Sequence, residues 1–240
     1  MTLNRSQRAI AKRVLGLIHD DGFVLVGGLA LLELGVTTRP TEDLDAFSNR
    51  AQDVGMIAAR VAETLRGEGL SVASDRTSES FARFVVTTGR YRQSALKVEL
   101  GFDTLMFPTV DSALGACASI RELGANKMLA AFARHQPRDL SDIYDLASLI
   151  PIRQMLDDAR RKDHGFNGEI LAEMILRTVQ VPNELWPLET DVAAVRTFMA
   201  QLADGLVDGT EFPSVPSREP LIETYRRSDG TIVRGYRRQS

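Results

Sequence analysis

The sequence predicts an α+β fold in which a mixed β-sheet with flanking helices is followed by a helical domain. Segments with helical and strand-like periodicity alternate at the start of the chain. Three strand-like runs then follow one another between residues 70 and 102, and from Ile120 to about residue 206 the pattern is helical. We therefore expect a sheet domain at residues 1–115, a helical domain at 116–208, and a linker and tail at 209–240.

Composition and charge are those of an ordinary globular protein. The chain has 240 residues, of which 44% are hydrophobic and 25% are charged, and it contains one cysteine. No apolar run approaches the roughly 20 residues that a membrane span requires, and the N-terminus lacks the apolar stretch of a secretory signal. A single cysteine allows no internal disulfide, which fits a reducing compartment. We expect a cytoplasmic protein with no membrane partner, and the net charge of −3 gives no general case for nucleic-acid binding.

Periodicity places the elements of the first domain. Ile10, Val14 and Leu17 recur at helical spacing behind Asn4, which is a favoured N-cap residue. From Leu96 onward, apolar and polar residues alternate as they do in a strand with one buried face. We expect helices at residues 4–19, 28–34 and 51–66, and strands at residues 23–27, 43–48, 70–74, 81–88 and 95–102. Such an order predicts a mixed sheet with helices packed on it.

Two glycines and two aspartates form the first candidate site. Gly27 and Gly28 follow an apolar run, and their backbone can approach a ligand closely because it carries no side chain. Asp43 and Asp45 lie two residues apart on an expected strand, so their side chains point to one side. Two like charges at one place are costly unless a cation lies between them, and Mg²⁺ prefers carboxylate oxygens. We expect the aspartates to bind Mg²⁺ or Mn²⁺, the glycines to hold phosphate, and the Thr41 hydroxyl to reach the same phosphates.

The segments Gly27–Ala30 and Arg39–Asp45, in this order, resemble the signature of the nucleotidyltransferase fold shared with DNA polymerase β. Their residue pattern is similar to that of the AbiEii/AbiGii toxin family, to which the mycobacterial MenT toxins also belong. The resemblance implies a nucleotidyltransferase-type sheet and a third metal-binding carboxylate on a strand beside the two aspartates. Glu99 is the candidate because it points away from the apolar face of its strand. Asp103 is the alternative, and an ordinary exposed glutamate is the competing interpretation of Glu99.

The helical domain carries a second motif. Lys127 and Arg134 are seven residues apart on an expected helix and share one face. They are followed by Asp139 and Asp142, three apart on one side of the next helix. This pattern again resembles the AbiEii-type toxins, in which the lysine and an aspartate of the second motif complete the active site. The resemblance gives these roles to Lys127 and Asp142, with Asp139 as the alternative, and it makes Lys127 and Arg134 candidates for nucleotide binding. A salt-bridged helix pair is the competing interpretation, and both can hold at once.

The remainder of the chain carries little chemistry. Helices are expected at about residues 152–162, 167–180 and 188–206. Three prolines between residues 213 and 220 indicate an extended linker. Asp229 and Gly230 lie between strand-like segments and indicate a possible hairpin in the tail.

These parts predict a metal-dependent nucleotidyltransferase that transfers a nucleoside monophosphate from an NTP to an acceptor hydroxyl. The family resemblance further implies that the acceptor is the 3′ end of tRNA and that the protein is the toxin of a toxin–antitoxin pair with a cognate antitoxin. One alternative is an enzyme that modifies a small molecule such as an aminoglycoside. The other is a non-catalytic nucleotide-binding module, against which the intact pair Asp43 and Asp45 argues. Spacing does not identify the NTP, because the choice of base depends on pocket shape.

Overall fold

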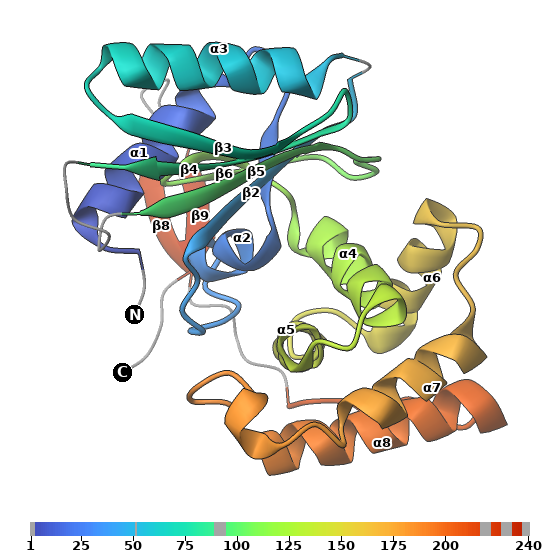
Figure 1. The fold of residues 1–240 in the computed structure, drawn as a ribbon. Helices are drawn as coiled ribbons and strands as arrows, with labels where there is room; N and C mark the ends of the chain where they lie inside the picture. The colour runs from blue at the N-terminus through green and yellow to red at the C-terminus, as the bar shows by residue number, and fades with distance from the viewer. Residues whose placement is uncertain (1–2, 51, 89–94, 217–221, 227–231, 237–240) are drawn as a thin grey trace. The chain divides into compact units, whose positions relative to one another are not determined.

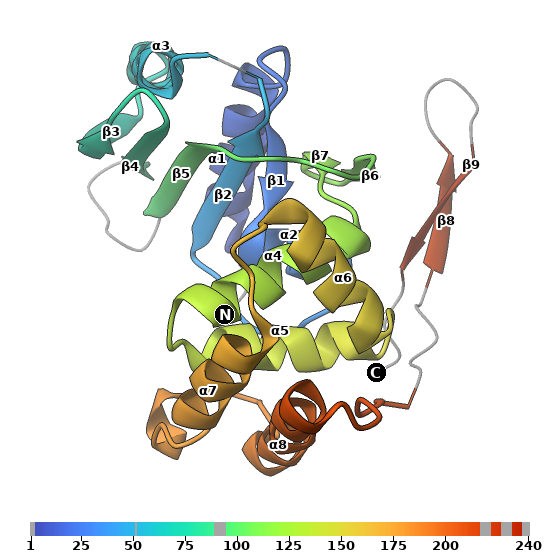
Figure 2. The same cartoon turned by 90° about the vertical axis from the view of Figure 1, so that its right-hand side faces the viewer.

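The structure is a computed structural model that describes residues 3–50, 52–88, 95–216, 222–226 and 232–236 (Figures 1 and 2). Its internal contacts divide the chain into two compact units. The first comprises Met1–Glu33 and Pro40–Ser119, and the second comprises Leu34–Arg39 and Ile120–Ser240. The division after Ser119 lies four residues beyond the boundary expected from the sequence, and the short segment 34–39 belongs to the helical unit.

The first unit is a mixed sheet with helices packed on it, as the sequence predicts. Its elements in chain order are α1 (Arg5–Leu17), β1 (Val24–Val26), α2 (Gly27–Glu33), β2 (Asp43–Ser48), α3 (Val54–Gly67), β3 (Ser71–Thr77), β4 (Phe81–Thr87), β5 (Leu96–Phe102), β6 (Val110–Ser112) and β7 (Gly115–Cys117). Within the described residues the sheet has seven strands in the order β3-β4-β5-β2-β1-β7-β6. Helix α3 runs along the sheet over β3 and β4 (Figure 1). Strand β2, which carries both aspartates, therefore lies at the centre.

Alternation along the central strands separates a buried face from a polar one. On β2, Leu44 and Ala46 are fully buried, and on β5 the same is true of Leu96, Val98 and Leu100. The two strands are parallel neighbours, with Asp43 opposite Lys97 and Asp45 opposite Glu99. Because the side-chain period of a strand is two, the polar residues of β2 and β5 gather on the other face. The register thus brings charged residues of two distant segments together.

Strands β6 and β7 were not expected from the sequence, which indicates only a boundary rich in small residues there. Strand β7 pairs parallel to β1 at Leu25 and Cys117, and antiparallel to β6. Each of the two strands is three residues long, too short for a periodic pattern to emerge. They extend the first unit to Ser119. Burial raises the pKa of the Cys117 thiol to about 12, so this cysteine is an inert core residue.

The second unit is helical up to residue 208. Its elements are α4 (Ile120–Ala133), α5 (Pro137–Ala147), α6 (Ile152–Lys162), α7 (Gly168–Thr178), the short 3₁₀ helix η2 (Asn183–Leu185), α8 (Val192–Asp208), β8 (Ile222–Arg226) and β9 (Ile232–Tyr236). Helix α4 contacts α5, α6 and α7, and α7 lies beside α8 (Figures 1 and 2). Leu140, Ile143 and Leu146 of α5 are buried, as their spacing predicts. No described helix has the length and apolarity to cross a bilayer.

The tail contains a pair of strands where the sequence indicates a hairpin. Strands β8 and β9 pair antiparallel, with Ile222 opposite Tyr236 and Arg226 opposite Ile232. The proposed turn at Asp229 and Gly230, and Pro220 of the linker, lie outside the described residues.

Candidate active site

The turn from β1 into α2 brings backbone against a carboxylate. Gly27 has a φ of +68°, and a Cβ atom at this position would lie 2.2 Å from Oδ2 of Asp45. Strand β1 runs antiparallel to β2, with Val26 opposite Asp45. Glycine is required here for two reasons, since L side chains disfavour this φ and no space exists for one. The predicted glycine motif therefore holds the second aspartate of the predicted pair.

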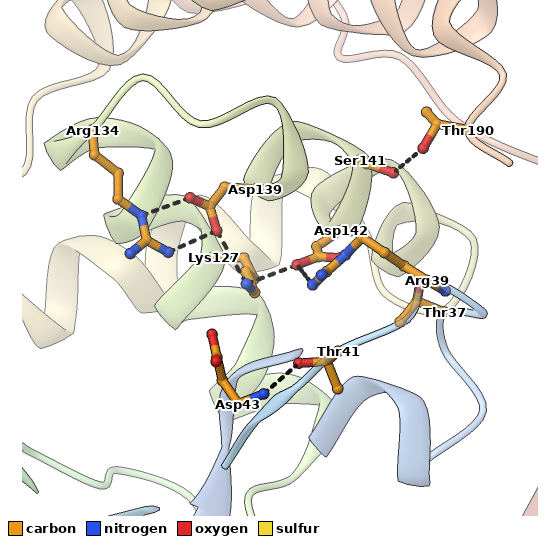
Figure 3. Close-up of polar contacts among 10 residues, drawn as sticks. All are labelled: Thr37, Arg39, Thr41, Asp43, Lys127, Arg134, Asp139, Ser141, Asp142 and Thr190. Carbon is orange, nitrogen blue, oxygen red and sulfur yellow. Dashed lines mark hydrogen bonds and ion pairs between the residues drawn. The ribbon is translucent and has the colours of Figure 1, made fainter. Parts of the chain in front are cut away.

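Asp43 and Asp45 lie on one side of β2, as predicted, and both are half-buried. The backbone N–H of Asp43 donates to the Thr41 hydroxyl, with a distance of 3.4 Å between nitrogen and oxygen (Figure 3). Thr41 itself is 9% exposed. Its hydroxyl thus contacts the start of β2, while its predicted contact with phosphate stays a prediction.

Two basic residues that the sequence analysis did not assign lie on the same face. Lys97 Nζ is 3.0 Å from Asp43 Oδ2 and 3.3 Å from Glu99 Oε1. Arg83 Nε, from β4, donates to Glu99 Oε1 at 2.9 Å. Burial disfavours the charged form of Lys97, but its hydrogen bonds and charge interactions with Asp43 and Glu99 outweigh burial and raise its pKa above the usual 10.5. Each carboxylate that the sequence predicts as a metal ligand is therefore close to a cation or to backbone of this chain.

The donor chemistry of this face fits a hard divalent cation. Asp43 and Asp45 supply carboxylate oxygens, which Mg²⁺ prefers. Register favours Glu99 over Asp103 as a third donor, because Glu99 lies opposite Asp45 while Asp103 follows the end of β5. Among the described residues, however, no three acidic, histidine or cysteine side chains are arranged around one cation position. The Glu99 carboxylate is bound to Arg83 and Lys97, so its role as a metal ligand stays a prediction.

The helical unit contains a buried network of charges (Figure 3). Lys127 Nζ, from α4, lies 3.1 Å from Asp139 Oδ1 and 2.7 Å from Asp142 Oδ2, both on α5. Arg134 donates to both oxygens of Asp139, from Nε at 2.7 Å and from Nη2 at 3.0 Å. Arg39 binds Asp142 in the same two-pronged way, at 3.2 and 3.1 Å. The second motif therefore forms a salt-bridged helix pair, which is compatible with the catalytic role that the family resemblance implies.

Burial sets the energetics of this network. Asp139 and Asp142 are completely buried, and Lys127 is 6% exposed. Burial raises the pKa of the Asp139 carboxyl, but Arg134 and Lys127 outweigh this effect and hold the pKa below its ordinary value of 3.8. Asp139 is therefore a strongly anchored anion, and the contacts of Asp139 and Asp142 together fix the position of the Lys127 ammonium.

The family assignment follows from a comparison of the whole sequence. The profile described as nucleotidyl transferase AbiEii toxin of type IV toxin–antitoxin systems matches residues 15–223. The chain belongs to the AbiEii toxin family. As an AbiEii protein it is a nucleotidyltransferase, and membership implies an NTP substrate and an antitoxin partner. The family resemblance seen in the glycine and aspartate motifs is thus confirmed.

Solved structures support the fold of this AbiEii chain. It resembles MenT4, a nucleotidyltransferase toxin from Mycobacterium tuberculosis, with a TM-score of 0.60 and 17% identity over 84% of this chain and 83% of that one. It also resembles JHP933 from Helicobacter pylori, with a TM-score of 0.56 and 21% identity over 87% and 94%. At this identity the likeness shows the fold, which confirms the predicted nucleotidyltransferase-type sheet. No curated protein sequence matches the chain.

Within each unit, the AbiEii structure brings predicted site residues together. Gly27, Asp43, Asp45 and Glu99 share one region of the sheet, and Lys127, Arg134, Asp139 and Asp142 share one network of the helices. Sequence reasoning missed Lys97, Arg83 and Arg39. The alternation along β5 puts Lys97 on the side of Glu99, but its contact with Asp43 depends on the pairing of β5 with β2. The bond from Arg39 to Asp142 spans 103 residues, and local spacing gives no signal for it.

Proposed function

We propose that this AbiEii protein transfers a nucleoside monophosphate from an NTP to a hydroxyl at the 3′ end of tRNA, with Mg²⁺ or Mn²⁺ bound at Asp43 and Asp45. The observation that carries the proposal is the pair of aspartates on one face of β2, against the backbone of Gly27. In the reaction the acceptor hydroxyl gives up its proton to water, and its oxygen forms a bond to the α-phosphorus. The bond from that phosphorus to the β-bridging oxygen breaks, and pyrophosphate leaves.

Each residue of the first unit has a role that its position supports. Asp43 and Asp45 would hold the cation, and Glu99 is the candidate for a third ligand once its carboxylate is free of Lys97 and Arg83. The bound cation would neutralise charge that develops on the phosphates during transfer. The turn at Gly27 and Gly28 offers backbone without side chains to the phosphate oxygens. Thr41 supports the start of β2 through its contact with the Asp43 N–H.

In the second unit we propose that Lys127 is the compact cation for the nucleotide triphosphate. Asp139 and Asp142 hold its ammonium at 3.1 and 2.7 Å, which restricts it to one position. Arg39 and Arg134 neutralise the remaining charge of the two carboxylates. Arg134, which is less buried than Lys127, is the second candidate for contact with the nucleotide.

Biologically, we propose that transfer to tRNA in the cytoplasm is the toxic activity, and that the cognate antitoxin suppresses it. The cytoplasm supplies both NTPs and tRNA. A small-molecule acceptor such as an aminoglycoside is the alternative to tRNA.

The test is an incorporation assay with the purified full chain. The protein is incubated with each α-labelled NTP, Mg²⁺ and total tRNA, and in parallel with a set of aminoglycosides. We expect label from at least one NTP on tRNA and none on the aminoglycosides. Label on an aminoglycoside alone would replace tRNA by a small molecule, and no label on either acceptor with any NTP would refute the proposal.

A further inference from the structure

Lys97 lies where two predicted metal ligands meet. Its ammonium is 3.0 Å from Asp43 and 3.3 Å from Glu99, and its side chain is 37% exposed. Within the strands, Lys97 is opposite Asp43 in the register, and Glu99 follows it by two residues on the same face. A single cation of the chain therefore bridges carboxylates from two neighbouring strands.

A cation at this position offsets repulsion between the neighbouring carboxylates. Asp43, Asp45 and Glu99 occupy adjacent positions on one face of β2 and β5, and three like charges at this spacing repel one another. Arg83 neutralises Glu99 from the β4 side, and among the described residues its ion-pair partners are Glu99 and Asp75. Among the described residues, Lys97 contacts both Asp43 and Glu99.

We propose that the Lys97 ammonium acts as a built-in competitor of the divalent cation, and that it leaves Asp43 when a metal ion binds there. The inference rests on the proposed metal site at Asp43 and Asp45. A lysine is suited to this exchange because its ammonium is a point charge on a flexible four-carbon stem, and its half-exposed side chain has room to turn away. Lys97 thereby keeps the carboxylates in place without metal and lowers the metal affinity of the site.

The first test measures Mn²⁺ binding by calorimetry on the full chain without nucleotide. Lys97→Met keeps the stem and removes the charge. Mn²⁺ then has no ammonium to displace from Asp43, so we expect a dissociation constant lower by about tenfold in Lys97→Met. Lys12→Met is the matched control, because it removes the same charge from an exposed position on α1. Its affinity should equal that of the unchanged protein.

A weaker or unchanged Mn²⁺ affinity in Lys97→Met, with binding intact in the unchanged protein, would overturn the role of Lys97 and leave the metal site standing. Absence of Mn²⁺ binding in every variant would overturn both this inference and the proposed metal site. Asp43→Asn tests the proposed metal site separately from the role of Lys97, because its Mn²⁺ binding should be lost whether or not Lys97 competes.

The second test needs no variant and so does not depend on the folding of Lys97→Met. Lysine acylation of the unchanged protein is followed by mass spectrometry with and without Mn²⁺. Release of the ammonium from Asp43 should speed the labelling of Lys97 severalfold, while the labelling of Lys12 stays the same. Labelling of Lys97 that is slowed or unaffected by saturating Mn²⁺ would contradict the displacement.

Discussion

Gly27 and Asp45 illustrate how single residues determine the geometry of the site. The backbone at Gly27 has a positive φ, and a Cβ there would lie 2.2 Å from the Asp45 carboxylate. A side chain at this position therefore has two consequences, strain in the turn and displacement of a proposed metal ligand. The second consequence links a backbone conformation directly to activity.

Gly27→Ala tests this link. We expect a loss of about 1 kcal/mol or more in the free energy of unfolding from the unfavourable φ, and transfer reduced by at least about tenfold because Asp45 must move. Gly16→Ala is the matched control: apart from the helix's own backbone, no atom lies within 4 Å of a Cβ at this position, so the change should leave transfer unchanged and stabilise slightly. Denaturant unfolding and transfer rates measure both. Equal transfer rates in Gly27→Ala and Gly16→Ala would contradict the proposed link between the Gly27 backbone and the position of Asp45.

What a sequence tells at this scale depends on whether the contacts are local. The shared side of Asp43 and Asp45 follows from strand periodicity alone and is present in the structure. The contact between Lys97 and Asp43 could not be predicted, because it requires the parallel pairing of strands 54 residues apart. For the same reason Glu99 could be placed on the correct face, yet its bonds to Arg83 and Lys97 were not foreseen.

At the scale of elements, α4 and α5 are joined by buried charges. From the sequence, an ion pair of Lys127 would be an exposed contact worth about 0–1 kcal/mol. In the structure its two aspartate partners are completely buried, so removal of the lysine leaves buried carboxylates with fewer donors. The stability cost expected for Lys127 is accordingly larger than the sequence alone suggests.

Lys127→Met separates a catalytic lysine from a structural one. We expect a loss of about 1–3 kcal/mol in the free energy of unfolding, together with transfer reduced by about 10². Lys162→Met is the matched control, since Lys162 is a buried lysine that pairs with Glu122 at 2.7 Å and has no proposed role in transfer. It should lose similar stability but transfer at a normal rate per folded molecule. A loss of stability with a normal transfer rate in Lys127→Met as well would show that Lys127 has no catalytic role.

Asp139 gives this helix pair a defined acid sensitivity. Its folded pKa is lower than its ordinary 3.8, so the ionised form stabilises the fold above that value, and this contribution is lost as the pH falls through the folded pKa. Asp139→Asn should lower the free energy of unfolding by about 1–3 kcal/mol at pH 7. The difference from the unchanged protein should shrink below about pH 4. Denaturant unfolding at several pH values measures this difference, with the exposed change Asp157→Asn as the control. A difference between Asp139→Asn and the unchanged protein that stayed constant with pH would contradict the prediction.

Element prediction succeeded where periodic runs were long and failed where strands were short. The strand at residues 43–48 and the helix at 152–162 have the predicted bounds. The three-residue strands β6 and β7 were missed, because their place in the sheet is determined by pairing with β1 and with each other. This pairing also carries the first unit past the expected boundary at residue 115.

At the scale of the whole molecule, the AbiEii family supplies a biological expectation. Expression of the chain alone in bacteria should slow growth, and Asp45→Asn should relieve the inhibition because it removes a proposed metal ligand. Asp157→Asn, an exposed change on α6, should remain inhibitory at equal expression. Growth curves measure the effect. Normal growth with abundant folded protein and no antitoxin would count against toxicity and favour the small-molecule alternative.

The central claim is that Asp43 and Asp45 carry metal-dependent nucleotidyl transfer. The most direct measurement is the rate at which the α-phosphate of a labelled NTP is incorporated into tRNA by the unchanged protein and by Asp45→Asn, each with Mg²⁺ and with excess chelator. We expect the chelator to abolish incorporation, and Asp45→Asn to lower it by about 10² to 10³ while the protein stays folded. Incorporation at the unchanged rate by Asp45→Asn, or by either protein in excess chelator, would contradict the claim.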